Sequence, residues 1–106
     1  MRRNLFVCDD ATPSLLSAIE EAIEDYKIQV RNSSFEICDT NSIPNRSFSY
    51  FNEFDKIYVL NDETTKKIKE SFDIENYKFC IIKLNKNADR KRRLSSVLFE
   101  LMLQNT

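Results

Sequence analysis

Four short apolar runs, each followed by a segment with helical spacing, constrain the fold of this chain more than any other feature. The runs cover residues 4–8, 27–32, 56–60 and 78–84, and residues 35–38 could continue the second one. They lack a regular alternation of apolar and polar side chains, which predicts strands that are buried on both faces, as in a parallel sheet. A chain of 106 residues has room for one such domain, over residues 1–106, and not for two.

The segments between the runs are predicted helices, over residues 13–26, 47–52, 62–72 and 88–104. Thr12 and Asp62 stand where helix N-caps are expected, and Pro13 suits a first helical turn. The apolar stripe of the first helix is Leu15, Leu16, Ile19, Ile23 and Tyr26, and that of the last is Leu94, Val97, Leu98, Leu101 and Met102.

Alternating strands and helices predict an α/β fold, a single doubly wound domain with a four-stranded parallel sheet in the order 2-1-3-4 and helices on both faces. Ligands of such sheets bind beyond the carboxyl ends of the strands, where the strand order reverses. Any site should therefore be formed by three loops, at residues 8–13, 61–62 and 85–90.

Composition excludes several classes of function. The chain has no glycine and no histidine, so glycine-rich phosphate loops and histidine-dependent triads are excluded. A net charge of −1 predicts no binding to nucleic acid or to anionic lipid. No apolar run is long enough to cross a membrane. The first residues resemble a signal peptide, but their apolar stretch ends after Cys8 at two acidic residues, so a cytoplasmic protein is expected. Cys8, Cys38 and Cys80 form no CxxC pair, and we expect no metal and no cofactor.

Residues 4–8 leading into a helix, together with "VRNS" and "FDKIYVLNDETTKKIKESF", resemble the short members of the low-molecular-weight protein tyrosine phosphatase family. The resemblance covers most of the chain and implies the same fold. It also implies a Cys-x5-Arg loop in which Cys8 would attack phosphorus and an arginine would hold the phosphoryl oxygens. A loop aspartate would protonate the leaving group, and Asp89 lies one residue from that position.

The chain departs from this pattern where the chemistry is carried out. Ser14 occupies the position of the arginine, and Asp9 and Asp10 follow Cys8 directly. A carboxylate about 6 Å from a phosphate charge costs roughly 3 kcal/mol at an effective dielectric constant of 20. The two acids should also raise the pKa of Cys8. We therefore expect Cys8 and Asp89 to be vestigial, and the domain to be a regulator or inhibitor that binds another protein.

Two alternatives keep chemistry in the loop that follows Cys8. In the first, the chain is a cysteine-dependent phosphatase, or a phosphocysteine carrier similar to the IIB components of sugar phosphotransferase systems, with Arg90 or Arg92 supplying the missing cation. In the second, Asp9, Asp10 and Asp62 bind a divalent cation, as the paired acids of receiver domains do.

Two further segments are candidates for contact with a partner. Residues 90–93 form a basic cluster in the predicted first turn of the last helix, where Arg90 and Arg92 could pair with Asp9 or Asp10 or bind an acidic partner. The aromatic segment around residues 48–54 has core spacing, and Tyr50 is its candidate anchor for a partner protein.

Overall fold

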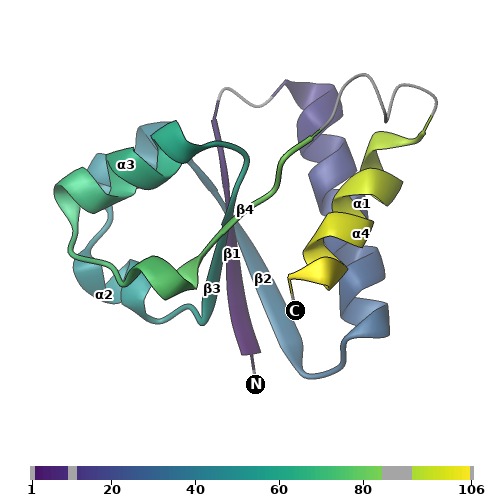
Figure 1. Ribbon diagram of the computed structural model, residues 1–106, viewed down its shortest axis with the longest axis horizontal. Coiled ribbons are helices and arrows are strands. Elements are labelled where there is room, and N and C mark those ends of the chain that lie inside the picture. Colours follow the sequence, from purple (N-terminus) through teal and green to yellow (C-terminus); the bar gives the residue numbers. More distant parts are fainter. Residues whose placement is uncertain (1, 10–11, 85–91, 106) are drawn as a thin grey trace.

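The computed structural model describes residues 2–9, 12–84 and 92–105, and within these ranges it contains one four-stranded parallel sheet. The strands are β1 (Arg2–Cys8), β2 (Ser33–Asp39), β3 (Lys56–Val59) and β4 (Phe79–Ile81). Their order is β2-β1-β3-β4, and every neighbouring pair is parallel (Figure 1). The predicted topology is confirmed.

Helices cover both faces of the sheet, as predicted. The helices α1 (Pro13–Gln29) and α4 (Leu94–Gln104) lie on one face (Figure 1). The helices α2 (Phe48–Asn52) and α3 (Asp62–Ser71) lie on the other face, with the short 3-10 helix η1 (Thr40–Asn45). A second 3-10 helix, η2 (Asn76–Lys78), leads into β4.

The predicted second strand at residues 27–32 is wrong. The helix α1 continues through these positions to Gln29, and the Val30 N–H donates to the Tyr26 carbonyl at 2.7 Å. The chain then turns at Asn32, whose φ of 60° lies in the left-handed region that asparagine tolerates well. The strand is formed instead by Ser33–Asp39, which includes the apolar residues 35–38.

Side-chain caps fix two of the helix starts. Thr12 caps α1, because its Oγ1 accepts from the Leu15 N–H at 3.2 Å, as predicted. The predicted cap at Asp62 is wrong: Asn61 caps α3 by accepting from the Thr64 N–H at 2.9 Å. Asp62 is the first helical residue, where a carboxylate interacts favourably with the helix dipole.

The last helix starts later than predicted. Residues 88–91 of the predicted helix lie outside the described residues, and α4 begins at Leu94, so Arg92 and Arg93 precede it. Much of its predicted stripe is confirmed, because Val97, Leu98 and Met102 are buried against α1 and the sheet.

Two separate apolar clusters, one on each face, hold the layers together. Successive strand side chains point to opposite faces, so Phe6 and Cys8 lie under α1 and α4, whereas Leu5 and Val7 lie under α2 and α3. Tyr58 of β3 stacks near Phe6, with ring centroids 6.3 Å apart. None of the helices in the described ranges has the length and apolar character needed to cross a bilayer.

Candidate functional site

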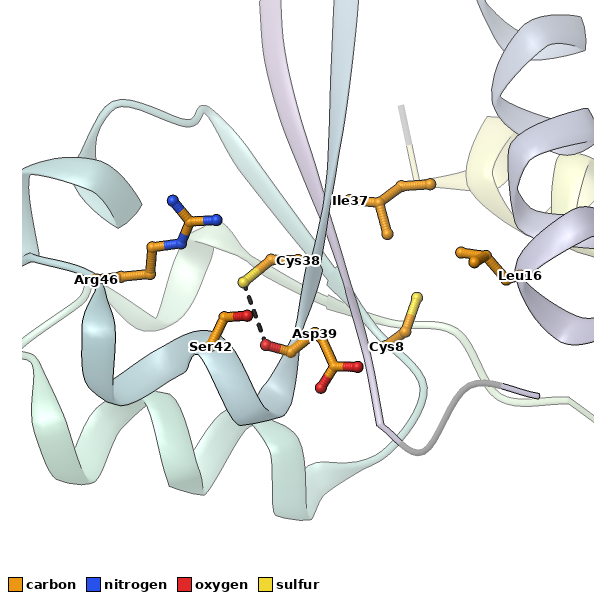
Figure 2. A pocket seen from close by; sticks show the side chains of 7 residues that line it. All are labelled: Cys8, Leu16, Ile37, Cys38, Asp39, Ser42 and Arg46. Carbon is orange, nitrogen blue, oxygen red and sulfur yellow. Dashed lines mark hydrogen bonds between the residues drawn. The ribbon is translucent and has the colours of Figure 1, made fainter. Parts of the chain in front are cut away.

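A hollow of about 320 Å³ lies at the carboxyl ends of β1 and β2, next to the point where the strand order reverses (Figure 2). This is the edge of the sheet where the fold predicts a ligand site. We call it the carboxyl-edge hollow. Its lining residues are Cys8, Leu16, Ile37, Cys38, Asp39, Ser42 and Arg46.

Cys8 is part of the core at the rim of this hollow. Its side chain lies on the same side of the strands as Ile37 and Leu16 and is only 1% exposed (Figure 2). Burial, together with the neighbouring Asp39 carboxylate and Cys38 thiol, raises the pKa of the Cys8 thiol to about 12. The predicted direction agrees, although the nearby carboxylate is Asp39 and not Asp9. Cys8 is therefore a protonated thiol at neutral pH, which is a poor nucleophile.

Two other residues predicted for this site, Ser14 and Asp9, are exposed and half-buried, respectively. Ser14, at the position of the family's arginine, is exposed, and its hydroxyl lies 3.2 Å from the Thr12 hydroxyl. The Asp9 carboxylate accepts a hydrogen bond from the Thr40 hydroxyl at 3.0 Å. Asp9 thus joins the end of β1 to η1. Neither Asp9 nor Ser14 lines the carboxyl-edge hollow.

Arg46 supplies the positive charge of the hollow, and the sequence analysis missed it. It follows η1 and lies, with Ser42 and Cys38, on the opposite side of the strands from Cys8 (Figure 2). Burial raises the pKa of Cys38, and the charge and hydrogen bonding of the Arg46 guanidinium offset part of that rise. The sequence predicts a cation for this site only from residues 90–93, because Ser14 occupies the position of the arginine in the loop after the first strand. The position of Arg46 after the neighbouring second strand was the signal that could have identified it.

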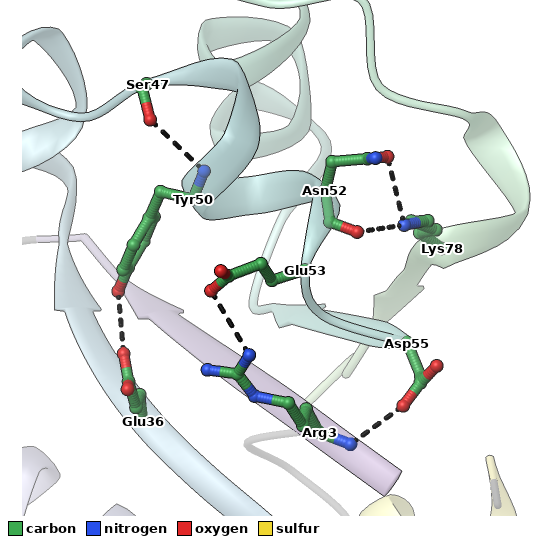
Figure 3. A network of polar contacts seen from close by, with 8 residues as sticks. All are labelled: Arg3, Glu36, Ser47, Tyr50, Asn52, Glu53, Asp55 and Lys78. Carbon is green, nitrogen blue, oxygen red and sulfur yellow. Dashed lines mark hydrogen bonds and ion pairs between the residues drawn. The ribbon is translucent and has the colours of Figure 1, made fainter.

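Tyr50 is fixed between polar and aromatic neighbours. Its hydroxyl donates to the Glu36 carboxylate at 3.2 Å (Figure 3), and its ring lies 5.2 Å from the Phe51 ring and 5.3 Å from the Phe54 ring. The Arg46 guanidinium lies over the Tyr50 ring, 4.5 Å from its centroid. Burial and nearby negative charge raise the pKa of Tyr50 to about 12. Tyr50 is half-buried, whereas Phe48 on the same helix is 45% exposed.

The polar contacts of α2 continue to the other strands. Arg3 of β1 pairs with Glu53 at 3.2 Å, and its N–H donates to Asp55 at 2.8 Å (Figure 3). The buried Lys78 ammonium donates to the carbonyl of Asn52 at 2.7 Å, which satisfies a carbonyl at the end of α2. These contacts fix the helix that carries Tyr50, and the turn that follows it, against β1 and η2.

The two arginines of the basic cluster that the structure describes pair with glutamates of two helices. Arg92 pairs with Glu100 of α4 at 2.6 Å, and Arg93 pairs with Glu21 of α1 at 2.5 Å. The pairing of Arg92 with Asp9 or Asp10 stays a prediction. These pairs connect the start of α4 to its own second turn and to α1.

Three predicted site residues lie outside the described residues, namely Asp10, Asp89 and Arg90. Asp62 is exposed in the first turn of α3. Within residues 2–9, 12–84 and 92–105 no three acidic or cysteine side chains gather as metal ligands would.

Comparisons of the chain with protein-family models, with curated proteins and with solved structures give no significant match.

Proposed function

We propose that this chain is a non-catalytic domain, related to the low-molecular-weight tyrosine phosphatases, that regulates or inhibits another protein by binding it. The single observation that carries the proposal is the state of Cys8. The residue is 1% exposed, and its pKa is raised to about 12, so thiolate is scarce at neutral pH.

The surroundings of Cys8 agree with a loss of turnover. Phosphoryl transfer depends on cations that stabilise the developing charge. In this chain Ser14 stands where the family has arginine, and the charged group that acts on Cys8 is the Asp39 carboxylate. Arg46 lies on the other side of the strands (Figure 2). The same observations count against a phosphocysteine carrier, which also needs a reactive Cys8.

Binding of a protein is supported by the surface next to the hollow. Phe48 is 45% exposed on α2, the helix that also carries Tyr50, and aromatic and arginine side chains are enriched at protein interfaces. The three cysteines are all free and buried, which fits a cytoplasmic domain that is not stabilised by disulfides.

Turnover of para-nitrophenyl phosphate tests the absence of catalysis. We expect the wild type and Cys8→Ser to give the same rate, equal to that of buffer. Alkylation by iodoacetamide should show an apparent pKa above about 8.5 for Cys8. Turnover that disappears in Cys8→Ser would overturn the proposal.

Site-specific photo-crosslinking in the native host tests the binding role. A photoreactive side chain at position 48 should cross-link to a defined protein. The matched control is position 28, because Ile28 is 77% exposed near the end of α1, away from the carboxyl-edge hollow. Equal cross-linking at both positions, or none at position 48, would contradict a binding surface around α2.

A further inference from the structure

We propose that the Arg46 side of the carboxyl-edge hollow binds a carboxylate presented by the partner protein, either an acidic side chain or a C-terminus. This inference rests on the proposed function and names the group that the hollow recognises. The guanidinium and the Ser42 hydroxyl are the donors available on this side of the hollow. Arginine matches a carboxylate through two parallel hydrogen bonds.

The Arg46 guanidinium is available for such a ligand. Among the described residues, the ion pairs are made by other arginines and lysines, and no carboxylate lies within pairing distance of Arg46. Its hydrogen bonding to Cys38 engages a neutral thiol and leaves its charge unpaired. Its exposed side chain nevertheless has a defined position, because it lies 4.5 Å from the Tyr50 ring centroid. Tyr50 is in turn fixed by its hydrogen bond to Glu36 at 3.2 Å. A cation fixed in this way loses less conformational entropy when it binds a ligand.

The carboxylate of the hollow, Asp39, does not occupy the Arg46 side. Side chains alternate along β2, so Ile37 and Asp39 share one face, and Glu36 and Cys38 share the other. Ile37 belongs to the cluster under α1 and Cys38 to the cluster under α2 and α3. Asp39 is also engaged by the chain itself, because it accepts from the Asn41 N–H at 2.8 Å. Glu36 lies on the Arg46 face, but its carboxylate accepts from the Tyr50 hydroxyl at 3.2 Å and does not line the hollow. Of the two charged lining residues, Asp39 therefore lies on the Cys8 side and Arg46 on the other.

The lining favours a monoanion over a phosphate dianion. Arg46 is the one cation among the seven lining residues, so a second negative charge would be desolvated without a partner. A carboxylate needs one cation only. The volume of about 320 Å³ suits a single side chain or chain end rather than a large ligand.

A titration followed by amide nuclear magnetic resonance tests the proposal. The probe is the α-methylamide of N-acetylglutamate, which carries a single side-chain carboxylate, and the neutral control is the α-methylamide of N-acetylglutamine. A second acid, N-acetylalanine, carries only an α-carboxylate and represents a C-terminus, so the acid that binds more tightly identifies the source. We expect saturable shifts at the amides of Ser42 and Arg46 with the acid and none with the amide. Arg46→Gln should weaken binding at least about tenfold, and Arg46→Lys should weaken it by less, because the charge is kept and the planar fork is lost. Arg31→Gln, which removes the same charge from the turn before β2, should leave binding unchanged.

The outcomes separate this proposal from the proposed function. Equal shifts with both probes, or equal affinity in wild type and Arg46→Gln, would overturn the carboxylate site even if the domain is inactive and binds a protein. Phenyl phosphate that binds more tightly than either of the two singly charged acids would overturn the choice of a carboxylate. Phosphatase turnover that depends on Cys8 would overturn the proposed function and leave the Arg46 titration as a separate result. If Arg46→Gln does not fold, the two probes on the wild type still decide.

Discussion

Cys8 and Cys38 stand at the carboxyl ends of neighbouring strands, are almost equally buried, and differ in the charge beside them. Cys8 is 1% exposed and has the Asp39 carboxylate nearby without a cation to offset it, whereas Cys38 is 2% exposed and has the Arg46 guanidinium nearby as well as Asp39 and Glu36. They belong to different apolar clusters because the strands direct them to opposite faces. The thiol expected to carry out chemistry has an anion for a neighbour, and the cation lies beside the other thiol. Location at the same edge of the sheet is therefore not sufficient for catalysis. A nucleophile and the cation that supports it must also lie on the same face of the sheet.

The largest expected effect tests whether the two faces are packed equally well. Phe51 of α2 and Leu98 of α4 are both fully buried. Phe51→Ala should therefore lower the free energy of unfolding by about 3–5 kcal/mol, and Leu98→Ala by about 2–5 kcal/mol. Urea denaturation measures both. Phe48→Ala is the matched control on the same helix and should cost less than about 1 kcal/mol. A Phe48→Ala cost equal to that of Phe51→Ala would show that the packing of α2 is wrong.

The second prediction concerns the pH dependence of the two thiols. The pKa of Cys8 is about 12 in the folded state against 9.0 in the unfolded chain, so the unfolded chain loses its proton first as the pH rises. The stability that this difference contributes is fully present below about pH 9 and is lost above it. Between about pH 8.5 and pH 10 the wild type should lose roughly 1 kcal/mol more than Cys8→Ala, measured by urea denaturation.

The same measurement on Cys38→Ala sharpens the contrast between the two cysteines. Its effect should have the same sign and be smaller, because Arg46 offsets part of the rise in the pKa of Cys38. An effect larger than that of Cys8→Ala would contradict the conclusion that Arg46 lowers the pKa of Cys38 relative to that of Cys8.

The third prediction tests the support of Arg46. Tyr50→Phe removes the hydrogen bond to Glu36 and should cost about 0.5–1.5 kcal/mol in thermal or urea unfolding. Tyr77→Phe is the control, because Tyr77 is 72% exposed, and it should change stability by less than about 0.5 kcal/mol. Equal effects of the two substitutions would mean that the hydrogen bond of the Tyr50 hydroxyl does not stabilise the fold, and therefore does not fix the ring on which Arg46 stacks.

The smallest expected effect concerns the basic cluster. Glu21→Gln removes the exposed pair with Arg93 and should cost no more than about 0.5 kcal/mol in low salt. Raising the salt concentration to about 1 M should abolish the difference from the wild type. A loss that persists in high salt would indicate packing of α4 on α1 through this contact rather than electrostatics.

The sheet order could be predicted because strand–helix alternation and right-handed crossovers leave few topologies. The second strand was predicted too early because Ile28 and Val30 are residue types that favour strands. In the structure α1 continues to Gln29, and Ile28 is 77% exposed on that helix. Asn61 and Asp62 are both good caps, and only the backbone geometry decides between them.

The composition of the site was harder to predict than its place. The edge of the sheet follows from topology, and Cys8 follows as the end of the first strand. Asp39 was missed, because the second strand was predicted too early in the chain. Arg46 does not, because its approach depends on η1, a short 3-10 helix with Pro44 inside it that brings the chain back beside Cys38. The stacking of Arg46 on Tyr50 likewise depends on how the end of η1 is oriented relative to α2, and the sequence pattern does not indicate that orientation.

The alternation of side chains along the strands has a consequence for any attempt to engineer a reactive Cys8. An arginine placed at position 14 would add a cation at the start of α1, while the Cys8 sulfur stayed beneath that helix. Sliding β1 by one residue to expose the sulfur would also turn Phe6 and Leu5 to the wrong faces and disrupt both apolar clusters. An exposed and reactive Cys8 would therefore require coordinated changes in two layers at once, which a single substitution does not supply.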